Sequence, residues 1–351
     1  MQQKFLARFL SFQSDNLKSK IKNRKWVGCF AIVVALMACG ARVEAQQTGK
    51  VFRIGFLDGG TAAGRAALVK AFLHELTKLG WIEGKNFTIE YRFAEGKPGR
   101  RPELAAELVR LKVDLIVATG SAAAWVAKKS TGSIPIVMTN AADPVGEGIV
   151  ANLARPGGNV TGFSALSTDL NTKRLEVLKD AVPKLARVGL LRSPTQAGLG
   201  NLQMKELRSA AMALKLKLEE IETQYDAKAL ESAFQTAKQK QVGAIMAMPT
   251  GSFFAQRKRI VELASKHRLP AIYFSKEFVD EGGLMSYGVD LDDLFRKAAH
   301  YVDKILKGTK PADLPVQQAT KFEFIISLKA AKQIGLTLPV RLLERANQVI
   351  K

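Results

Sequence analysis

The feature that most constrains the fold is an alternation, from residue 51 onward, between short apolar runs rich in β-branched residues and longer segments with helical spacing. The first unit has an apolar strand at 51–57, a Gly-rich loop, and a helix at 65–79 with Leu68 and Leu76 on one face. Strands that alternate with helices in this way build parallel sheets covered by helices on both faces. The sequence therefore predicts an α/β fold.

The alternation continues in two series, and the 351 residues are enough for two Rossmann-like lobes. In the first series we expect strands at 87–93, 113–118, 134–138 and 160–163, with helices at 102–111, at 121–129 and after Pro144. In the second series we expect helices at 169–181, 199–215, 227–240 and 252–267, with strands at 187–192, 216–222, 243–248 and 270–274. The two series indicate a duplicated architecture.

The last part of the chain does not form another clean unit. Extended stretches at 284–288 and 322–328 flank a predicted helix at 291–307, and we interpret them as crossings between the lobes. The predicted first lobe comprises residues 50–163 plus about 286–313, and the second comprises 164–285 plus about 319–351. Several crossings form a hinge, which lets two lobes close around a ligand. The predicted architecture is two Rossmann-like lobes with parallel sheets, joined by a hinge of several crossings.

The N-terminal segment has the pattern of an export signal. Arg24 and Lys25 precede an apolar run at 26–38, which is shorter than the ~20 residues that a membrane-spanning helix needs. We interpret residues 1–45 as a signal peptide with a long n-region, cleaved after Ala45 to give a soluble periplasmic protein. The alternative is a lipobox that would anchor the protein through an acylated Cys39.

Charge and cysteine content narrow the class of protein. The apolar and charged fractions, 47% and 24%, are typical of globular proteins. Removal of residues 1–45 lowers the formal charge from +21 to +15, and the remaining basic residues are spread over predicted helices. This distribution favours a solvated basic surface, with no nucleic acid as partner. Both cysteines, Cys29 and Cys39, lie in the signal segment, so no disulfide is expected in the mature chain.

Candidate ligand-binding residues follow the strands, because open α/β sheets bind ligands beyond the carboxyl ends of their strands. Thr119, Gly120 and Ser121 begin a helix whose free amides could bind a carboxylate. Asn140 and Asp143 could hold a substrate amine or another polar end, although Asp143 could instead be an N-cap. The remaining candidates at strand ends are Asp58, Gly59, Gly60, Ser193, Pro249, Thr250 and Tyr287, the last of which could stack on the ligand.

Catalytic and metal-binding patterns are missing from the sequence. The histidines, His74, His267 and His300, lack metal-ligand spacing, and no Gly-x-Ser-x-Gly elbow is present. The glycines at 59–64 have neither dinucleotide nor phosphate-loop spacing. We therefore expect a monomeric binding protein without enzymatic activity, cofactor or metal. An enzyme or a ligand-sensing protein on the same scaffold is the alternative, but a cofactor loop and a preceding helix-turn-helix are lacking.

The runs Ala-Arg-Pro-Gly-Gly-Asn-Val-Thr-Gly at 154–162 and Gly-Gly-Leu-Met-Ser-Tyr-Gly at 282–288 are highly specific. Through them and most of residues 51–350, the chain resembles the substrate-binding proteins of ABC transporters with the type I periplasmic-binding fold.

The resemblance implies an extracytoplasmic, non-catalytic protein that delivers a small molecule to an ABC permease, with aromatic or related amino acids among its ligands. The cleft elements it implies are the loop after Leu57, residues 119–121 and 140–143, the tip near Pro249 and Thr250, and Tyr287. One departure concerns ligand preference: relatives commonly carry Asn-Pro after the strand at 187–192, whereas this chain has Arg192-Ser193-Pro194.

Overall fold

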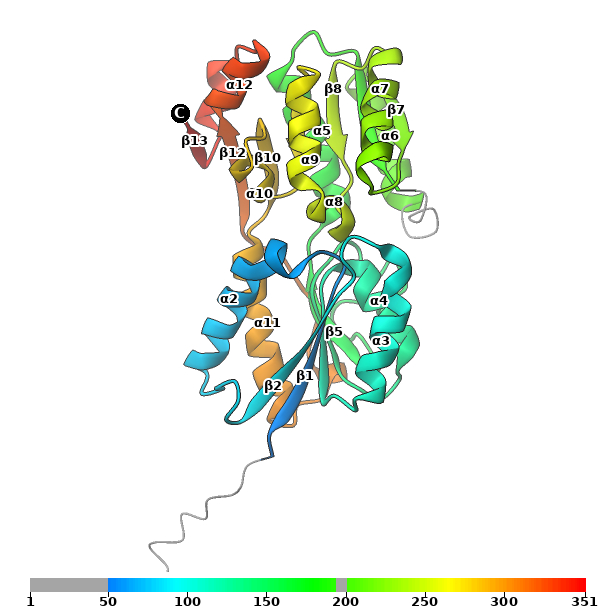
Figure 1. Ribbon diagram of the computed structural model, residues 1–351, viewed down its shortest axis with the longest axis vertical. Helices are drawn as coiled ribbons and strands as arrows, with labels where there is room; N and C mark the ends of the chain where they lie inside the picture. Colours follow the sequence, from blue (N-terminus) through cyan, green and yellow to red (C-terminus); the bar gives the residue numbers. More distant parts are fainter. Residues whose placement is uncertain (1–49, 194–200) are drawn as a thin grey trace, which may run out of the picture. The chain divides into compact units, whose positions relative to one another are not determined.

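The structure is a computed structural model that describes residues 50–193 and 201–351. The predicted signal segment at 1–45, including Cys39, and Pro194 lie outside the described residues. Residues Val51–Lys351 form one compact unit, which contains two lobes, each built on its own sheet (Figure 1). The described part of the chain contains no helix long and apolar enough to cross a membrane.

The first lobe is built on a six-stranded sheet with the order β11-β5-β4-β3-β1-β2, in which every neighbouring pair is parallel. Its strands are β1 (Phe52–Asp58), β2 (Phe87–Phe93), β3 (Leu115–Ala118), β4 (Ile136–Ala141), β5 (Val160–Ser164) and β11 (Gln317–Gln318). Its helices are α2 (Ala62–Lys78), α3 (Arg101–Arg110), α4 (Gly120–Ser130) and α11 (Leu291–Leu306), with short 3₁₀ turns at Pro98–Arg100 and Pro311–Asp313. The predicted α/β alternation of this lobe is confirmed.

The second lobe is built on a seven-stranded sheet with the order β13-β12-β10-β9-β8-β6-β7. Its strands are β6 (Arg187–Arg192), β7 (Lys217–Glu222), β8 (Ala244–Ala247), β9 (Ala271–Tyr273), β10 (Met285–Val289), β12 (Phe322–Ser327) and β13 (Gln348–Ile350). Its helices are α5 (Ser167–Ala181), α6 (Asn201–Ala213), α7 (Ala227–Gln239), α8 (Gly251–Ala255), α9 (Arg257–Lys266), α10 (Glu277–Asp280), α12 (Leu328–Ile334) and α13 (Val340–Glu344). The β10–β12 pair is antiparallel, so this sheet is mixed rather than purely parallel.

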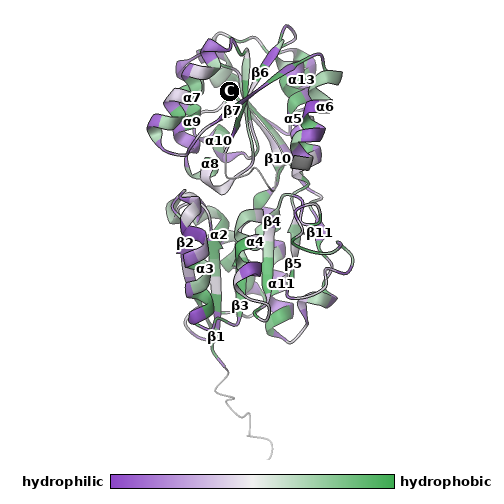
Figure 2. Ribbon diagram, turned by 90° about the vertical axis from the view of Figure 1, so that its right-hand side faces the viewer, coloured by the Kyte–Doolittle hydropathy of each residue, from purple (hydrophilic) through white to green (hydrophobic). Residues whose placement is uncertain are grey.

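Each sheet is covered on both faces because its strands direct alternate side chains to opposite sides. In β1, Ile54 and Phe56 join the core under α2 and α11, whereas Leu57 joins the core under α3 and α4 (Figure 1). In the second lobe, α7 and α9 cover one face, and α5, α6, α12 and α13 cover the other. In Figure 2 the strands are mostly green, and the purple, hydrophilic residues lie chiefly on the ribbons of the covering helices.

The chain crosses between the lobes three times, after β5, after β10 and after β11. Strand β10 belongs to the second sheet, where it pairs with β9 and β12, so the return to the first lobe comes after Val289 rather than at about residue 286. The extended stretches predicted at 284–288 and 322–328 are therefore not crossings: they are β10 and β12, two strands of the second sheet, and the crossings lie next to them. These three crossings are the connections that a hinge requires.

Two helix predictions need correction. The residues after Pro144 form turns rather than a helix, because Asp143 binds the amide of Gly146 and Gly148 adopts a left-handed φ of 68°. Glycine is also a poor helix former. The helix predicted at 252–267 is divided at Gln256 into α8 and α9.

Candidate functional site

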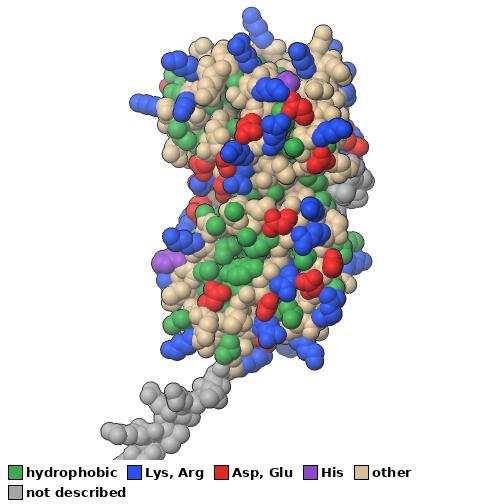
Figure 3. Space-filling model, viewed as in Figure 1, with side chains coloured by type: hydrophobic (Ala, Val, Ile, Leu, Met, Phe, Trp, Pro, Cys, Tyr) green, Lys and Arg blue, Asp and Glu red, His purple; other side chains and the backbone are tan. Residues whose placement is uncertain are grey.

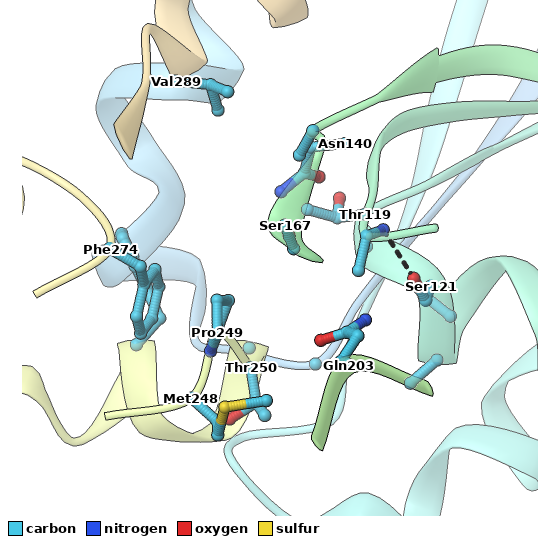
Figure 4. Close-up of a pocket in the computed structure, with 18 of the residues that line it drawn as sticks. Thr119, Ser121, Asn140, Ser167, Gln203, Met248, Pro249, Thr250, Phe274 and Val289 are labelled. Carbon is cyan, nitrogen blue, oxygen red and sulfur yellow. Dashed lines mark hydrogen bonds between the residues drawn. The ribbon is translucent and has the colours of Figure 1, made fainter. Parts of the chain in front are cut away.

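A pocket of about 170 Å³ lies at the carboxyl ends of the strands and is lined by both lobes. In Figure 4, Thr119, Asn140 and Ser167 lie on one side of the pocket, and Pro249 and Phe274 lie on the other. The lining comes from strand ends, loops and helices of both lobes. The lining residues are Gly59, Arg65, Arg101, Thr119, Gly120, Ser121, Ala122, Ala123, Asn140, Ala142, Glu147, Ala165, Ser167, Leu170, Arg174, Arg192, Gln203, Met204, Tyr225, Met248, Pro249, Thr250, Gly251, Phe254, Phe274, Val289 and Leu291.

The N-terminus of α4 forms a polar wall of the pocket in the first lobe. Thr119 is the N-cap residue, yet its side chain makes no capping hydrogen bond, and its buried Oγ1 has no partner among the described residues. Gly120 follows with a left-handed φ of 77°, a conformation that favours glycine. Ser121 Oγ accepts a 2.7 Å hydrogen bond from the amide of Ala142, which fixes this helix end against β4. The first amides of α4 therefore remain available to an anion in the pocket.

The end of β4 supplies an amide side chain beside this helix terminus. Thr139 Oγ1 donates a 2.6 Å hydrogen bond to Asn140 Oδ1. The carbonyl oxygen of Asn140 is thus oriented by its neighbour, while its amide nitrogen is left to donate toward the pocket (Figure 4).

The acid that lines the pocket is Glu147 rather than the predicted Asp143. Asp143 Oδ1 accepts a 2.9 Å hydrogen bond from the amide of Gly146, so this carboxylate closes a turn and is not a lining residue. Burial raises the pKa of Glu147 to about 7, and repulsion from Asp143 adds to the rise, while a hydrogen bond from Ser121 opposes it. Glu147 Oε2 is buried without a hydrogen bond to any described residue. This carboxyl group can therefore exchange a proton near neutral pH or receive a cationic group.

The loop after β8 and two phenylalanines form the apolar part of the wall in the second lobe. Met248 and Pro249 follow β8, and Thr250 Oγ1 accepts a 2.9 Å hydrogen bond from the amide of Phe253, which begins α8. The rings of Phe254 and Phe274 line the same pocket. An apolar surface opposite a group of polar donors is typical of small-molecule sites.

Contacts between the lobes close one side of the pocket. A Cβ on Gly251 would lie 3.3 Å from the Cα of Gly59, so the two backbones approach closely. Arg101 Nη2 donates a 3.1 Å hydrogen bond to Ser252 Oγ. The guanidinium carbon of Arg65 lies 3.9 Å from the centre of the Phe254 ring, within the range of a cation–π contact.

Four arginines line the pocket, and they differ in their partners. Arg65 pairs with buried Asp58 at 2.9 Å, and Arg192 pairs with Glu220 at 2.5 Å. Burial lowers the pKa of Arg101 from its ordinary value. Burial likewise lowers the pKa of Arg174 to about 9. Even so, Arg101 and Arg174 keep their positive charge at neutral pH.

The structure brings the predicted candidates together only in part. Those that line the pocket are Gly59, Thr119, Gly120, Ser121, Asn140, Pro249 and Thr250. Asp58 and Gly60 lie behind this wall, where Asp58 Oδ1 accepts a hydrogen bond from the Gly60 amide. Ser193 is buried outside the lining, and Tyr287 packs its ring against Phe324.

Sequence reasoning missed the lining residues that come from helices and from the crossings. Ser167, Val289 and Leu291 lie beside crossings, so the predicted hinge could have indicated them. Arg65, Arg101 and Arg174 lie on helices and carried no local signal, because a helical arginine is ordinarily a surface residue.

Residues 50–193 and 201–351 contain no group of three or more His, Cys, Asp or Glu side chains that could hold a metal ion. The groups that the described residues offer to a ligand in the pocket are hydrogen-bond donors, charged side chains and apolar side chains.

Comparison with known proteins identifies the family. A family model described as ABC transporter substrate binding protein matches residues 61–350. The chain is 30% identical over 271 residues to a tyrosine-binding protein of Clostridioides difficile (strain R20291), which covers 76% of each chain. A conserved domain protein of Vibrio cholerae has a similar structure, with a TM-score of 0.77, 29% identity and coverage of 86% of this chain and 100% of the other.

A second solved structure is the ABC domain in complex with L-Trp from Streptococcus pneumoniae. It has a TM-score of 0.77 and 26% identity, and the match covers 86% of this chain and 100% of that one. The family match covers nearly the whole of the two lobes. The chain belongs to the ABC transporter substrate-binding protein family.

Proposed function

We propose that this protein captures a small carboxylate of amino-acid size between its lobes, outside the cytoplasm, and presents the closed form to an ABC permease. The N-terminus of α4 is the observation that carries the proposal, because the buried Thr119 Oγ1 lacks a hydrogen-bond partner among the described residues, and the first amides of a helix have no acceptor within the helix. A carboxylate would satisfy these donors and interact favourably with the helix dipole.

The predicted site residues that line the pocket fit this pose. Thr119, Gly120 and Ser121 would bind the carboxylate, and Asn140 would donate to it from β4. Glu147 takes the place proposed for Asp143 as the group that would receive an ammonium. Gly59, Pro249 and Thr250 would shape the walls, whereas Tyr287 would act through its backbone rather than by stacking.

The size and walls of the pocket support a compact ligand. Its volume of about 170 Å³ is close to that of the ~150 Å³ cavity that accepts benzene in an engineered protein. The relatives that bind tyrosine and L-Trp support an amino-acid-like ligand with a ring. Phe254 and Phe274 provide an apolar surface for such a group.

Isothermal titration with a panel of amino acids and organic acids tests this function. Thr119→Val removes the hydroxyl but keeps the shape, so we expect about 10-fold weaker binding of carboxylates. Thr236→Val, a half-buried position on α7 outside the pocket lining, is the matched control and should bind as the wild type does. Failure of every carboxylate to bind, or equal affinity of the Thr119→Val variant, would contradict the proposed function.

Export and assembly complete the proposal. We propose cleavage after Ala45 to release a soluble, monomeric periplasmic protein that performs no covalent chemistry and binds no nucleic acid. The distribution of basic side chains supports the proposal that the protein binds no nucleic acid, because Figure 3 shows Lys and Arg scattered among Asp and Glu over the face in view. Cell fractionation and the mass of the mature chain test export: a lipidated chain that begins at Cys39 would contradict soluble release.

A further inference from the structure

The pocket contains a buried positive charge whose hydrogen-bond partners are neutral. Arg174 is 2% exposed and lines the pocket from α5. Its Nε donates a 2.6 Å hydrogen bond to the backbone oxygen of Tyr287, and its Nη1 donates a 2.5 Å hydrogen bond to Asn171 Oδ1. Across residues 50–193 and 201–351, no carboxylate lies within ion-pair distance of Arg174, and Nη2 forms no hydrogen bond. This nitrogen is thus available to a ligand.

Two of the other three arginines that line the pocket have acid partners. Arg65 and Arg192 have acids of the chain itself as partners, namely Asp58 and Glu220. Arg101, like Arg174, donates to a neutral group, the hydroxyl of Ser252. Within the described lining, the charges of Arg101 and Arg174 are therefore not compensated by an ion pair.

Burial of a charge without a charged partner is strongly unfavourable. This cost is reflected in the pKa of Arg174, which burial lowers to about 9. The guanidinium nevertheless stays protonated at neutral pH. An anionic group on the ligand would offset the lost hydration through a charge-assisted hydrogen bond.

We propose that the substrate is a small organic molecule with two acid groups, one held at the N-terminus of α4 and the other by Arg174. This inference rests on the proposed function, which places the first carboxylate at Thr119. The two binding groups belong to different lobes, so a ligand with an acid at each end would bridge them and favour closure. Glu147 lies in the same pocket and would receive an amino group if the diacid carries one.

The test compares ligands with the same skeleton by isothermal titration at pH 7. L-Glutamate and glutarate carry two acid groups, whereas L-glutamine carries one; terephthalate and benzoate form a second pair with a ring. We expect at least one diacid to bind 10-fold or more tightly than its single-acid counterpart. Tighter binding of L-glutamate than of glutarate would identify an amino diacid, and the reverse would identify a simple diacid.

Variants of Arg174 assign the preference to this side chain. Arg174→Gln keeps a hydrogen-bonding group but loses the charge, so we expect diacid affinity to fall about 30-fold or more, with little change for the single-acid ligand. Arg174→Lys keeps the charge and should retain most of the preference. Arg345→Gln removes an arginine that pairs with Asp180 away from the pocket and should leave the preference unchanged.

Each result bears on the proposal in a defined way. Single-acid ligands that bind as tightly as the diacids would overturn the diacid assignment and leave the proposed function intact. Equal loss of both ligand types in Arg174→Gln would indicate a purely structural role for Arg174 and would also overturn it. If Arg174→Gln does not fold, the affinities of the wild type and of Arg174→Lys for diacids and single acids still test the diacid assignment. If no carboxylate binds to the wild-type protein, the proposed function itself is rejected.

Discussion

Replacement of Glu147 by glutamine should stabilise the ligand-free protein, and more so at alkaline than at acidic pH. The side chain lines the pocket, and its Oε2 is buried without a hydrogen bond to a described residue. Burial raises the pKa of this carboxyl from the ordinary 4.5 to about 7. The folded protein therefore binds the proton more tightly than the unfolded chain does.

The sign and the size of the effect follow from this difference. Between about pH 4.5 and about pH 7, Glu147 is ionised in the unfolded chain but still protonated in the folded protein. Ionisation therefore stabilises the unfolded chain alone, and the free energy of unfolding falls as the pH rises. Above pH 7 the loss is complete and amounts to at most roughly 3 kcal/mol, since one pKa unit corresponds to about 1.4 kcal/mol. Glutamine carries no charge and avoids this loss.

Urea unfolding at pH 5 and pH 8.5 measures the effect. We expect Glu147→Gln to raise the free energy of unfolding by roughly 1 kcal/mol at pH 5 and roughly 3 kcal/mol at pH 8.5, relative to the wild type. Glu206→Gln removes an exposed carboxylate from α6 and serves as the control. An equal change at both pH values for Glu147→Gln would refute the reasoning.

Two further substitutions test packing and closure. Gly162→Ala should destabilise the protein by about 3 kcal/mol or more in urea unfolding, because the new Cβ would lie 2.2 Å from the carbonyl oxygen of Met138 and Gly162 has a φ of 131°. The control is Gly132→Ala, whose Cβ would have no atom within 4 Å, and it should change the free energy of unfolding by less than about 1 kcal/mol. Similar effects at the two glycines would contradict this. Phe254→Leu removes the ring that Arg65 contacts at 3.9 Å from the other lobe, so ligand affinity should fall about 5-fold, for a loss of about 1 kcal/mol. Unchanged affinity in isothermal titration would show that this contact does not support closure.

The sequence was most informative where local pattern and burial coincide. Strands such as β1 and β8 are short, apolar and bounded by turns, so both their existence and their position could be predicted. The helix predicted after Pro144 was wrong because turn bonding by Asp143 competes with helix formation, and a proline at the start does not decide that competition. The antiparallel β12 could not be predicted, because strand direction depends on how the chain crosses the hinge.

The site residues, too, could be predicted only where the local sequence determines their position. Thr119 and Asn140 could be identified because the end of a parallel strand is fixed by the strand itself. Asp143 and Tyr287 have suitable chemistry and position in the sequence, but side-chain direction places them outside the pocket lining. Arg174 lies within a helix, and its burial depends on the packing of α5 against β10, which no local pattern reveals.

A crystal structure of the protein with its tightest carboxylate ligand tests the capture of a substrate between the lobes most directly. We expect the ligand in the pocket, with a carboxylate within hydrogen-bond distance of Thr119 Oγ1 and the amides of Gly120 and Ser121. For a diacid, the second carboxylate should meet Nη2 of Arg174. A ligand bound elsewhere on the surface, or one held by a single lobe without contact to the N-terminus of α4, would contradict the proposed mode of capture.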